Sequence, residues 1–199
     1  MKTFLQPFFA LLLGASLAVA GNPIEFSADL KEFKGEGGIT YNRLTFKDDK
    51  QTIDFIPPKG WNCTLSGKNL HLRPADKNFA AAEIEAIPLL AAPKPLDETA
   101  IAALAQQVLA ALPPESQQAT IVKQEQNPFL GNHEGFEVTA SYKALGDTFQ
   151  RSVLFVNTPT NQIVFKLTAK KSDFETLHRA FRGSISSWVW QESATKNPG

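Results

Sequence analysis

The sequence predicts an α+β protein in which an antiparallel β-sheet is flanked by helices, as an α/β/α sandwich. Most segments between residues 39 and 169 alternate polar with apolar residues or are rich in β-branched and aromatic residues, which is the pattern of strands. Two longer segments repeat apolar residues at helical spacing instead, and one of them follows the last of these predicted strands.

Residues 1–20 are predicted to be a cleaved signal peptide. Lys2 supplies the positive charge, residues 4–13 form a short apolar run, and Ala18, Val19 and Ala20 form a small-x-small cleavage site. Cleavage after Ala20 gives a periplasmic or secreted protein, and the leader would act as a membrane anchor only if cleavage failed. Gly21 follows the site, so no lipid-attachment cysteine is expected there.

The remaining chain is predicted to form one domain with short flanking segments. Residues 21–38 indicate a loosely structured N-terminal arm, with a short strand at 24–26. Residues 39–190 form the folded domain, which has an ordinary size for a single hydrophobic core. The polar residues 191–199 are expected to form a flexible tail.

The first predicted helix spans residues 97–112. Its apolar residues recur at positions that share one helical face, namely Ile101, Leu104, Val108 and Leu112. Asp97 is the expected N-cap, and Pro113 cannot continue the helix.

The second predicted helix begins at Ser172 and runs to about residue 190. Ser172 and Glu175 have the spacing of a capping box, in which each side chain satisfies the other's backbone N–H. The apolar stripe of this helix consists of Phe174, Leu177, Phe181, Ile185 and Trp188.

Nine strands are predicted, at 39–46, 52–56, 61–65, 69–73, 82–87, 119–126, 134–143, 148–156 and 162–169. A turn at Leu145 and Gly146 would pair Tyr142 with Phe149 and place apolar residues opposite each other along the hairpin. Residues 153–156 and 163–165 are apolar on both faces, so their strands are expected at the centre of the sheet.

The charge and cysteine content exclude several functional classes. Removal of residues 1–20 leaves 19 Lys and Arg against 20 Asp and Glu, without the basic excess of a nucleic-acid-binding protein. Cys63 is the single cysteine, which excludes an internal disulfide and cysteine-rich metal sites. No cofactor is expected, and the spacing of His71, His133 and His178 indicates no zinc site.

Cys63 and His71 are the strongest candidates for a nucleophile and its base, because their strands form a hairpin. A three-residue loop would pair these two residues directly. A two-residue loop at Gly67 and Lys68 pairs Cys63 with Leu72 instead, and it suits a type II′ turn. This second register keeps the apolar pattern, so Cys63 is predicted to be buried and His71 to face water beside Thr64.

The other candidate residues are predicted to be structural or solvated. His178 borders the apolar stripe of the second helix and is expected to pack there with a hydrogen bond. His133 and the Asp48-Asp49-Lys50 turn lie in exposed loops, which are the expected contacts for a partner. The Lys170-Lys171 pair is expected to be solvent-exposed, and the sequon at Asn62 matters only in a eukaryotic secretory cell.

The order of these elements resembles the PsbP/DcrB-like fold, which is shared with the Ran-binding Mog family. The likeness begins at residues 53–61, which end in a Pro-x-Gly-Trp turn at Trp61, and it continues through the hairpin ending at Pro74. The helix at 100–112, the meander at 119–169 and the helix at 174–190 complete it. The resemblance implies an accessory role and carries no binding residues with it. DcrB-type proteins resemble lipoproteins, whereas Gly21 stands here after the cleavage site.

These observations predict an exported, soluble, non-catalytic domain of the cell envelope that binds another envelope protein. One alternative is a carrier of a small apolar, lipid-like ligand held in a cleft between sheet and helix. A third, ranked below both, is a hydrolase whose site forms only in three dimensions. No catalytic or metal-binding residues are predicted.

Overall fold

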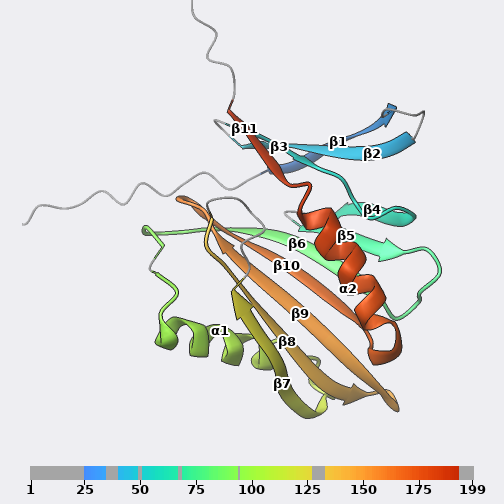
Figure 1. The fold of residues 1–199 in the computed structure, drawn as a ribbon, viewed down its shortest axis with the longest axis vertical. Coiled ribbons are helices and arrows are strands. Elements are labelled where there is room, and N and C mark those ends of the chain that lie inside the picture. The colour runs from blue at the N-terminus through green and yellow to red at the C-terminus, as the bar shows by residue number, and fades with distance from the viewer. Residues whose placement is uncertain are drawn as a thin grey trace, which may run out of the picture.

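The structure is a computed structural model that describes residues 25–34, 40–48, 51–66, 69–93, 95–126 and 133–192. Across these ranges the chain forms two antiparallel sheets and two helices (Figure 1). The predicted signal peptide and residues 193–199 of the predicted tail lie outside them. Neither helix is long and apolar enough to cross a bilayer.

The larger sheet has seven strands, and all are among the strands predicted from the sequence. In spatial order they are β4 (Trp61–Ser66), β5 (Asn69–Pro74), β6 (Ala81–Pro88), β10 (Asn161–Lys170), β9 (Asp147–Asn157), β8 (Gly135–Ala144) and β7 (Gln117–Gln126). The predicted β8–β9 register is confirmed, with Tyr142 opposite Phe149. Strands β9 and β10 lie near the centre of the sheet, as their apolar runs predict.

The smaller sheet was only partly predicted. Its spatial order is β1 (Glu25–Lys34), β2 (Thr40–Asp48), β3 (Gln51–Phe55) and β11 (Val189–Glu192). Strand β1 is therefore a ten-residue strand paired with β2, rather than a loosely structured arm with a short strand. Strand β11 includes two residues assigned to the flexible tail. The alternation of Phe26, Ala28 and Leu30 breaks at the adjacent Lys31 and Glu32, and β11 is too short to show a pattern, so pairing with β2 and β3 supplies the order of both strands.

Helix α1 (Glu98–Ala110) packs on one face of the seven-stranded sheet. Its predicted N-cap is confirmed, because the Asp97 carboxylate accepts a hydrogen bond from the Ala100 N–H at 2.8 Å. Leu104 and Val108 face the sheet residues Phe136 and Val138 in one apolar cluster.

Helix α2 (Lys171–Ile185) lies on the opposite face, and both of its ends differ from the prediction. The strand β10 runs directly into it, so Lys170 is the N-cap residue and Ser172 is already inside the helix. The predicted capping box at Ser172 is therefore wrong. The helix ends at Ile185, and Trp188 lies in the turn that follows. The Trp188 N–H donates to the Ile185 carbonyl.

The smaller sheet packs on the α2 face through Trp188. The Trp188 ring lies 5.7 Å from the Phe46 ring and 5.6 Å from the Phe55 ring, both in the smaller sheet. It also lies 5.2 Å from the ring of Phe165 in β10. The α+β class with antiparallel sheets is thus confirmed. The second face of the large sheet is covered by a helix and a sheet together, not by a helical layer alone.

The Pro-x-Gly-Trp turn connects the two sheets. Pro57 and Pro58 are buried, the Trp61 N–H bonds to the Pro58 carbonyl, and Gly60 has φ +78°. That left-handed backbone favours glycine. Trp61 is half-buried and stacks on Phe181 of α2, with ring centroids 6.1 Å apart, so this turn residue anchors the start of β4 to the helix.

Candidate functional site

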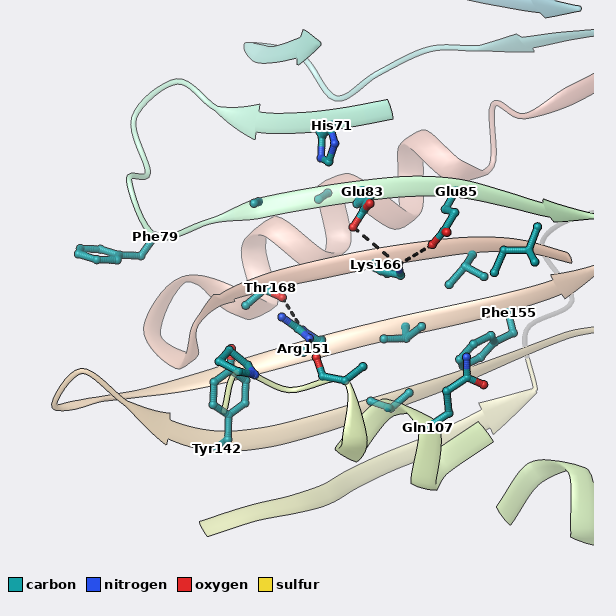
Figure 2. A pocket seen from close by; sticks show the side chains of 18 residues that line it. His71, Phe79, Glu83, Glu85, Gln107, Tyr142, Arg151, Phe155, Lys166 and Thr168 are labelled. Carbon is teal, nitrogen blue, oxygen red and sulfur yellow. Dashed lines mark hydrogen bonds and ion pairs between the residues drawn. The ribbon is translucent and has the colours of Figure 1, made fainter. Parts of the chain in front are cut away.

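A groove of about 530 Å³ lies between α1 and the uncovered part of the seven-stranded sheet. Helix α1 contacts β7 and β8, so the same face of β6 and β10 stays open beside the helix. The groove is lined by β5, β6, the last turns of α1, β8, β9 and β10 (Figure 2). Its volume is in the range of ligand-binding clefts. We call this the α1 groove.

One wall of the α1 groove is apolar. Val108 of α1 meets Val153 and Phe155 of β9 and Val164 of β10. All four side chains belong to the core between helix and sheet, and each is at most 5% exposed. This wall is therefore packed and preformed.

The opposite wall is charged. The Lys166 ammonium lies 2.7 Å from a Glu85 carboxylate oxygen and 3.7 Å from one of Glu83. The Asn69 amide also donates to Glu83, at 2.5 Å. His71 is the neighbour of Glu83 across β5 and β6. A molecule in the groove would therefore meet apolar atoms on the α1 side and ionic groups on the open sheet.

Two exposed apolar side chains also line the α1 groove. Phe79 precedes β6 and is 54% exposed, and Ile87 near the end of β6 is 36% exposed. Phe79 makes an edge contact with Phe149, at 6.5 Å between centroids, and the Lys170 ammonium lies 4.4 Å above its ring. Exposed aromatic residues of this kind are typical anchors of protein interfaces.

The structure separates Cys63 from His71. Cys63 pairs with Leu72 and Thr64 with His71, as the two-residue loop predicts. Cys63 is half-buried rather than fully buried as predicted, and it packs against the α2-side core, where burial raises the pKa of its thiol to about 11. His71 lies on the opposite face and lines the α1 groove. The pair therefore has no nucleophile–base geometry.

The loops expected to contact a partner are described only in part. His133 lies 4.5 Å from the Trp190 ring, and burial lowers the pKa of its imidazole while a hydrogen bond with the Asn157 backbone opposes this. Residues 127–132 and 49–50 lie outside the described ranges, so these loops stay a prediction. Lys170 is not simply solvated, because its ammonium pairs with Asp147 at 2.6 Å.

His178 belongs to a buried polar cluster that the sequence pattern does not predict. Its Nε2 lies 2.5 Å from Glu137 of β8, and Phe174 stacks on its ring, so the predicted hydrogen-bonded packing role is confirmed. The Ser152 hydroxyl donates to the same Glu137 oxygen, and Arg182 lies 3.6 Å from the other one. Glu137 was missed because it is the outward-facing position of an alternating strand, which becomes buried once α2 covers it.

The order of contacts in this cluster bears on the hydrolase alternative. The Ser152 hydroxyl donates to the carboxylate of Glu137 and not to the His178 imidazole. In a Ser-His-Asp triad the imidazole is the immediate partner of the serine hydroxyl. The cluster therefore ties α2 to the sheet rather than activating Ser152. Among the described residues no three His, Cys, Asp or Glu side chains gather as a metal site would require.

A second hollow, of about 640 Å³, lies beside α2 and is lined mostly by polar residues, together with Val122 and Phe174. Arg182 in its wall is 2.6 Å from Glu125, and Lys123 is 2.8 Å from the same residue. These cations are thus neutralised within the protein. The α1 groove, which combines an apolar wall with exposed aromatic and aliphatic side chains, is the better candidate site.

The fold is similar to that of known structures, although sequence comparison finds nothing. No protein-family model and no curated protein matches the chain. The solution structure of cyanobacterial PsbP (CyanoP) from Synechocystis sp. PCC 6803 matches 79% of this chain and 96% of its own, with a TM-score of 0.51 and 15% identity.

Two crystal structures match more weakly. The protein PA94 of Pseudomonas aeruginosa, described as of unknown function and a putative regulator, covers 82% of this chain and 99% of its own, with a TM-score of 0.46 and 11% identity. LpqN of Mycobacterium tuberculosis, described as involved in cell envelope biogenesis, covers 83% of this chain and 92% of its own, with a TM-score of 0.43 and 19% identity. The chain has the PsbP/DcrB-like fold that its sequence resembles. At this identity the likeness extends to the fold and no further.

Proposed function

We propose that this protein is an exported, non-catalytic accessory domain of the cell envelope that binds an extended segment of another envelope protein in the α1 groove. The leader at residues 1–20 supports export. The observation that carries the binding role is the groove itself, a preformed cleft of about 530 Å³ with one apolar and one charged wall.

The two walls favour a polypeptide as the occupant. An extended segment presents alternate side chains to opposite sides, so one set can contact Val108 and Val153 while the other meets Lys166 and Glu85. Phe79, which is largely exposed, provides an aromatic anchor at the groove.

Site-specific photocrosslinking in the cells that make the protein tests this function. The photoreactive residue p-benzoylphenylalanine replaces Phe79 in the full chain, and a matched control replaces Arg179, whose side chain is 79% exposed on α2. We expect position 79 to give one defined protein adduct and position 179 to give none of it. Equal adducts at both positions, or adducts only at position 179, would contradict the proposal.

A carrier role for a small apolar ligand is the second candidate, because the groove has a small-molecule volume and an apolar wall. The charged wall of the α1 groove and the exposed side chains at its rim favour a small apolar ligand less than they favour a polypeptide. Mass spectrometry of an organic extract of the purified protein distinguishes the two. Recovery of a stoichiometric lipid, together with no protein adduct at position 79, would show that the protein carries a lipid and would contradict the protein-binding role.

Export is tested separately from binding. We expect the protein isolated from the periplasm or medium to begin at Gly21, as read by N-terminal sequencing. A chain that keeps residues 1–20 and fractionates with membranes would show that the leader is retained as an anchor.

A further inference from the structure

Arg151 is held rigidly at one end of the α1 groove. It projects from β9, where its Nε donates to the Thr168 hydroxyl at 2.9 Å (Figure 2). Its Nη1 donates to the carbonyl of Ala111, the C-cap residue of α1, at 2.5 Å. The last turn of α1 has no basic residue, so the Arg151 charge also compensates the negative end of the helix dipole.

These two contacts leave most of the guanidinium unused. Arginine has five N–H groups, and both acceptors here are uncharged oxygens. In the part of the chain that the structure describes, no carboxylate forms an ion pair with Arg151. A planar cation fixed by neutral partners and lining a groove is suited to bidentate contact with an anion.

The Tyr142 hydroxyl is a second donor at the same end. Tyr142 lines the groove and stacks on Phe149, with ring centroids 5.7 Å apart. Its hydroxyl makes no hydrogen bond to any other described residue. Burial raises the pKa of Tyr142, and the nearby Arg151 charge opposes that shift while Glu115 adds to it. The phenol therefore stays protonated and able to donate.

We infer that Arg151 and the Tyr142 hydroxyl bind one carboxylate of the segment that occupies the α1 groove, so the partner segment is acidic at this point. This inference rests on the proposed function. The charge of the groove limits the anion to a single negative charge, because Lys166 is already shared by Glu83 and Glu85. A doubly charged phosphate would meet those carboxylates across the groove, whereas an aspartate or glutamate flanked by apolar residues matches both walls.

Immobilised nonapeptides provide the test without the natural partner. The array pairs each apolar-rich peptide that contains one aspartate with the same peptide carrying asparagine. We expect the retained peptides to favour aspartate by about tenfold or more, because hydrogen bonds to charged groups are worth about that factor. Equal retention of both members of the pairs would contradict the inference.

Variants locate the preference on the protein. We expect Arg151→Gln to abolish it, Arg151→Lys to retain part of it, and Tyr142→Phe to weaken it severalfold while keeping the stacked ring. Arg73→Gln, at an exposed position of β5 outside the groove, should leave it unchanged. A preference that survives Arg151→Gln in protein with an unchanged melting temperature would assign the carboxylate to another site.

The outcomes separate this inference from the proposed function. Adducts at position 79 without an aspartate preference would keep the groove as a protein site and reject the carboxylate contact. If decanoate binds in an Arg151-dependent way and no peptide is retained, the occupant is not a protein segment. The carboxylate that Arg151 binds would then belong to a free lipid.

Discussion

Glu137 shows how a single buried carboxylate is made stable in this protein. The residue is 4% exposed, and burial by itself would raise its pKa. Hydrogen bonds from His178 and Ser152, together with the charges of His178 and Arg182, outweigh burial and lower the pKa to about 2. The ionised form is therefore the form that the folded state stabilises.

The stability of the fold should depend on pH through Glu137. The pKa of Glu137 in the folded protein lies below its ordinary value of 4.5. The contribution of the ionised carboxylate to the free energy of unfolding is therefore complete above about pH 4.5 and is lost as the pH falls towards 2. We expect Glu137→Gln to reduce the free energy of unfolding by roughly 3 kcal/mol at pH 7 and to flatten its decline in acid. Urea unfolding at pH 7, 4 and 2.5 measures both. Glu175→Gln, exposed on α2, serves as the control, and parallel curves for all three proteins would contradict the assignment.

Cys63 should be unreactive in the folded protein. Burial raises the pKa of its thiol from 9.0 to about 11, which lowers the thiolate fraction near pH 8 by about a hundredfold. We expect modification by iodoacetamide to be slower by about that factor in buffer than in 8 M urea. Similar rates in the two solvents would show that the thiol is accessible and ionisable.

The two helices begin in different ways, and the difference is visible in single side chains. Helix α1 follows a loop, so its first N–H groups need the Asp97 side chain. Helix α2 follows β10 without a loop, and its N-cap residue Lys170 makes no side-chain hydrogen bond to the helix. Its first turn carries Asp173 instead, which pairs with Lys77 at 2.9 Å.

This difference predicts opposite responses to alanine. Asp97→Ala should cost about 1 kcal/mol of stability because a helix cap is lost. Ser172→Ala should cost nothing or stabilise slightly, since Ser172 lies inside α2 and alanine is the better helix former. Thermal unfolding of both variants checks the pair, and a loss for Ser172→Ala equal to that for Asp97→Ala would restore the predicted capping box.

The sequence predicts the elements better than it predicts the site. Nine strands, two helices and the 63–72 and 142–149 registers follow from local periodicity, because each hairpin is contiguous in the chain. The α1 groove does not, because Phe79, Arg151 and Lys166 come together only through the pairing of β6 with β10. The cluster around Glu137 was missed for the same reason, since α2 covers β8 from a distant part of the sequence.

At the scale of the whole molecule, Trp188 joins the two sheets. It is 4% exposed and contacts aromatic residues of both sheets. Its indole N–H has no hydrogen-bond partner among the residues that can be described. The ring therefore acts through packing alone.

Removal of this ring should loosen the smaller sheet first. We expect Trp188→Ala to cost about 3–5 kcal/mol because it leaves a large cavity, and Trp188→Phe to cost less. Hydrogen exchange should accelerate in β3 and β11 before it does in β9 and β10. Val189→Ala, at a half-exposed neighbouring position, should change neither measurement. Uniform acceleration throughout the chain would show that the two sheets unfold as one unit.

The pairing of β11 with β3 imposes an order on folding during synthesis. A chain that emerges with its N-terminus first presents β2 and β3 long before Trp188 and β11 are available. Until then Phe46 and Phe55 lack the Trp188 ring that packs against them. The smaller sheet can therefore be completed only after β11 has been synthesised, so this part of a nascent chain stays incompletely folded until then. A chain that ends before Trp188 would expose an apolar surface that is prone to aggregation.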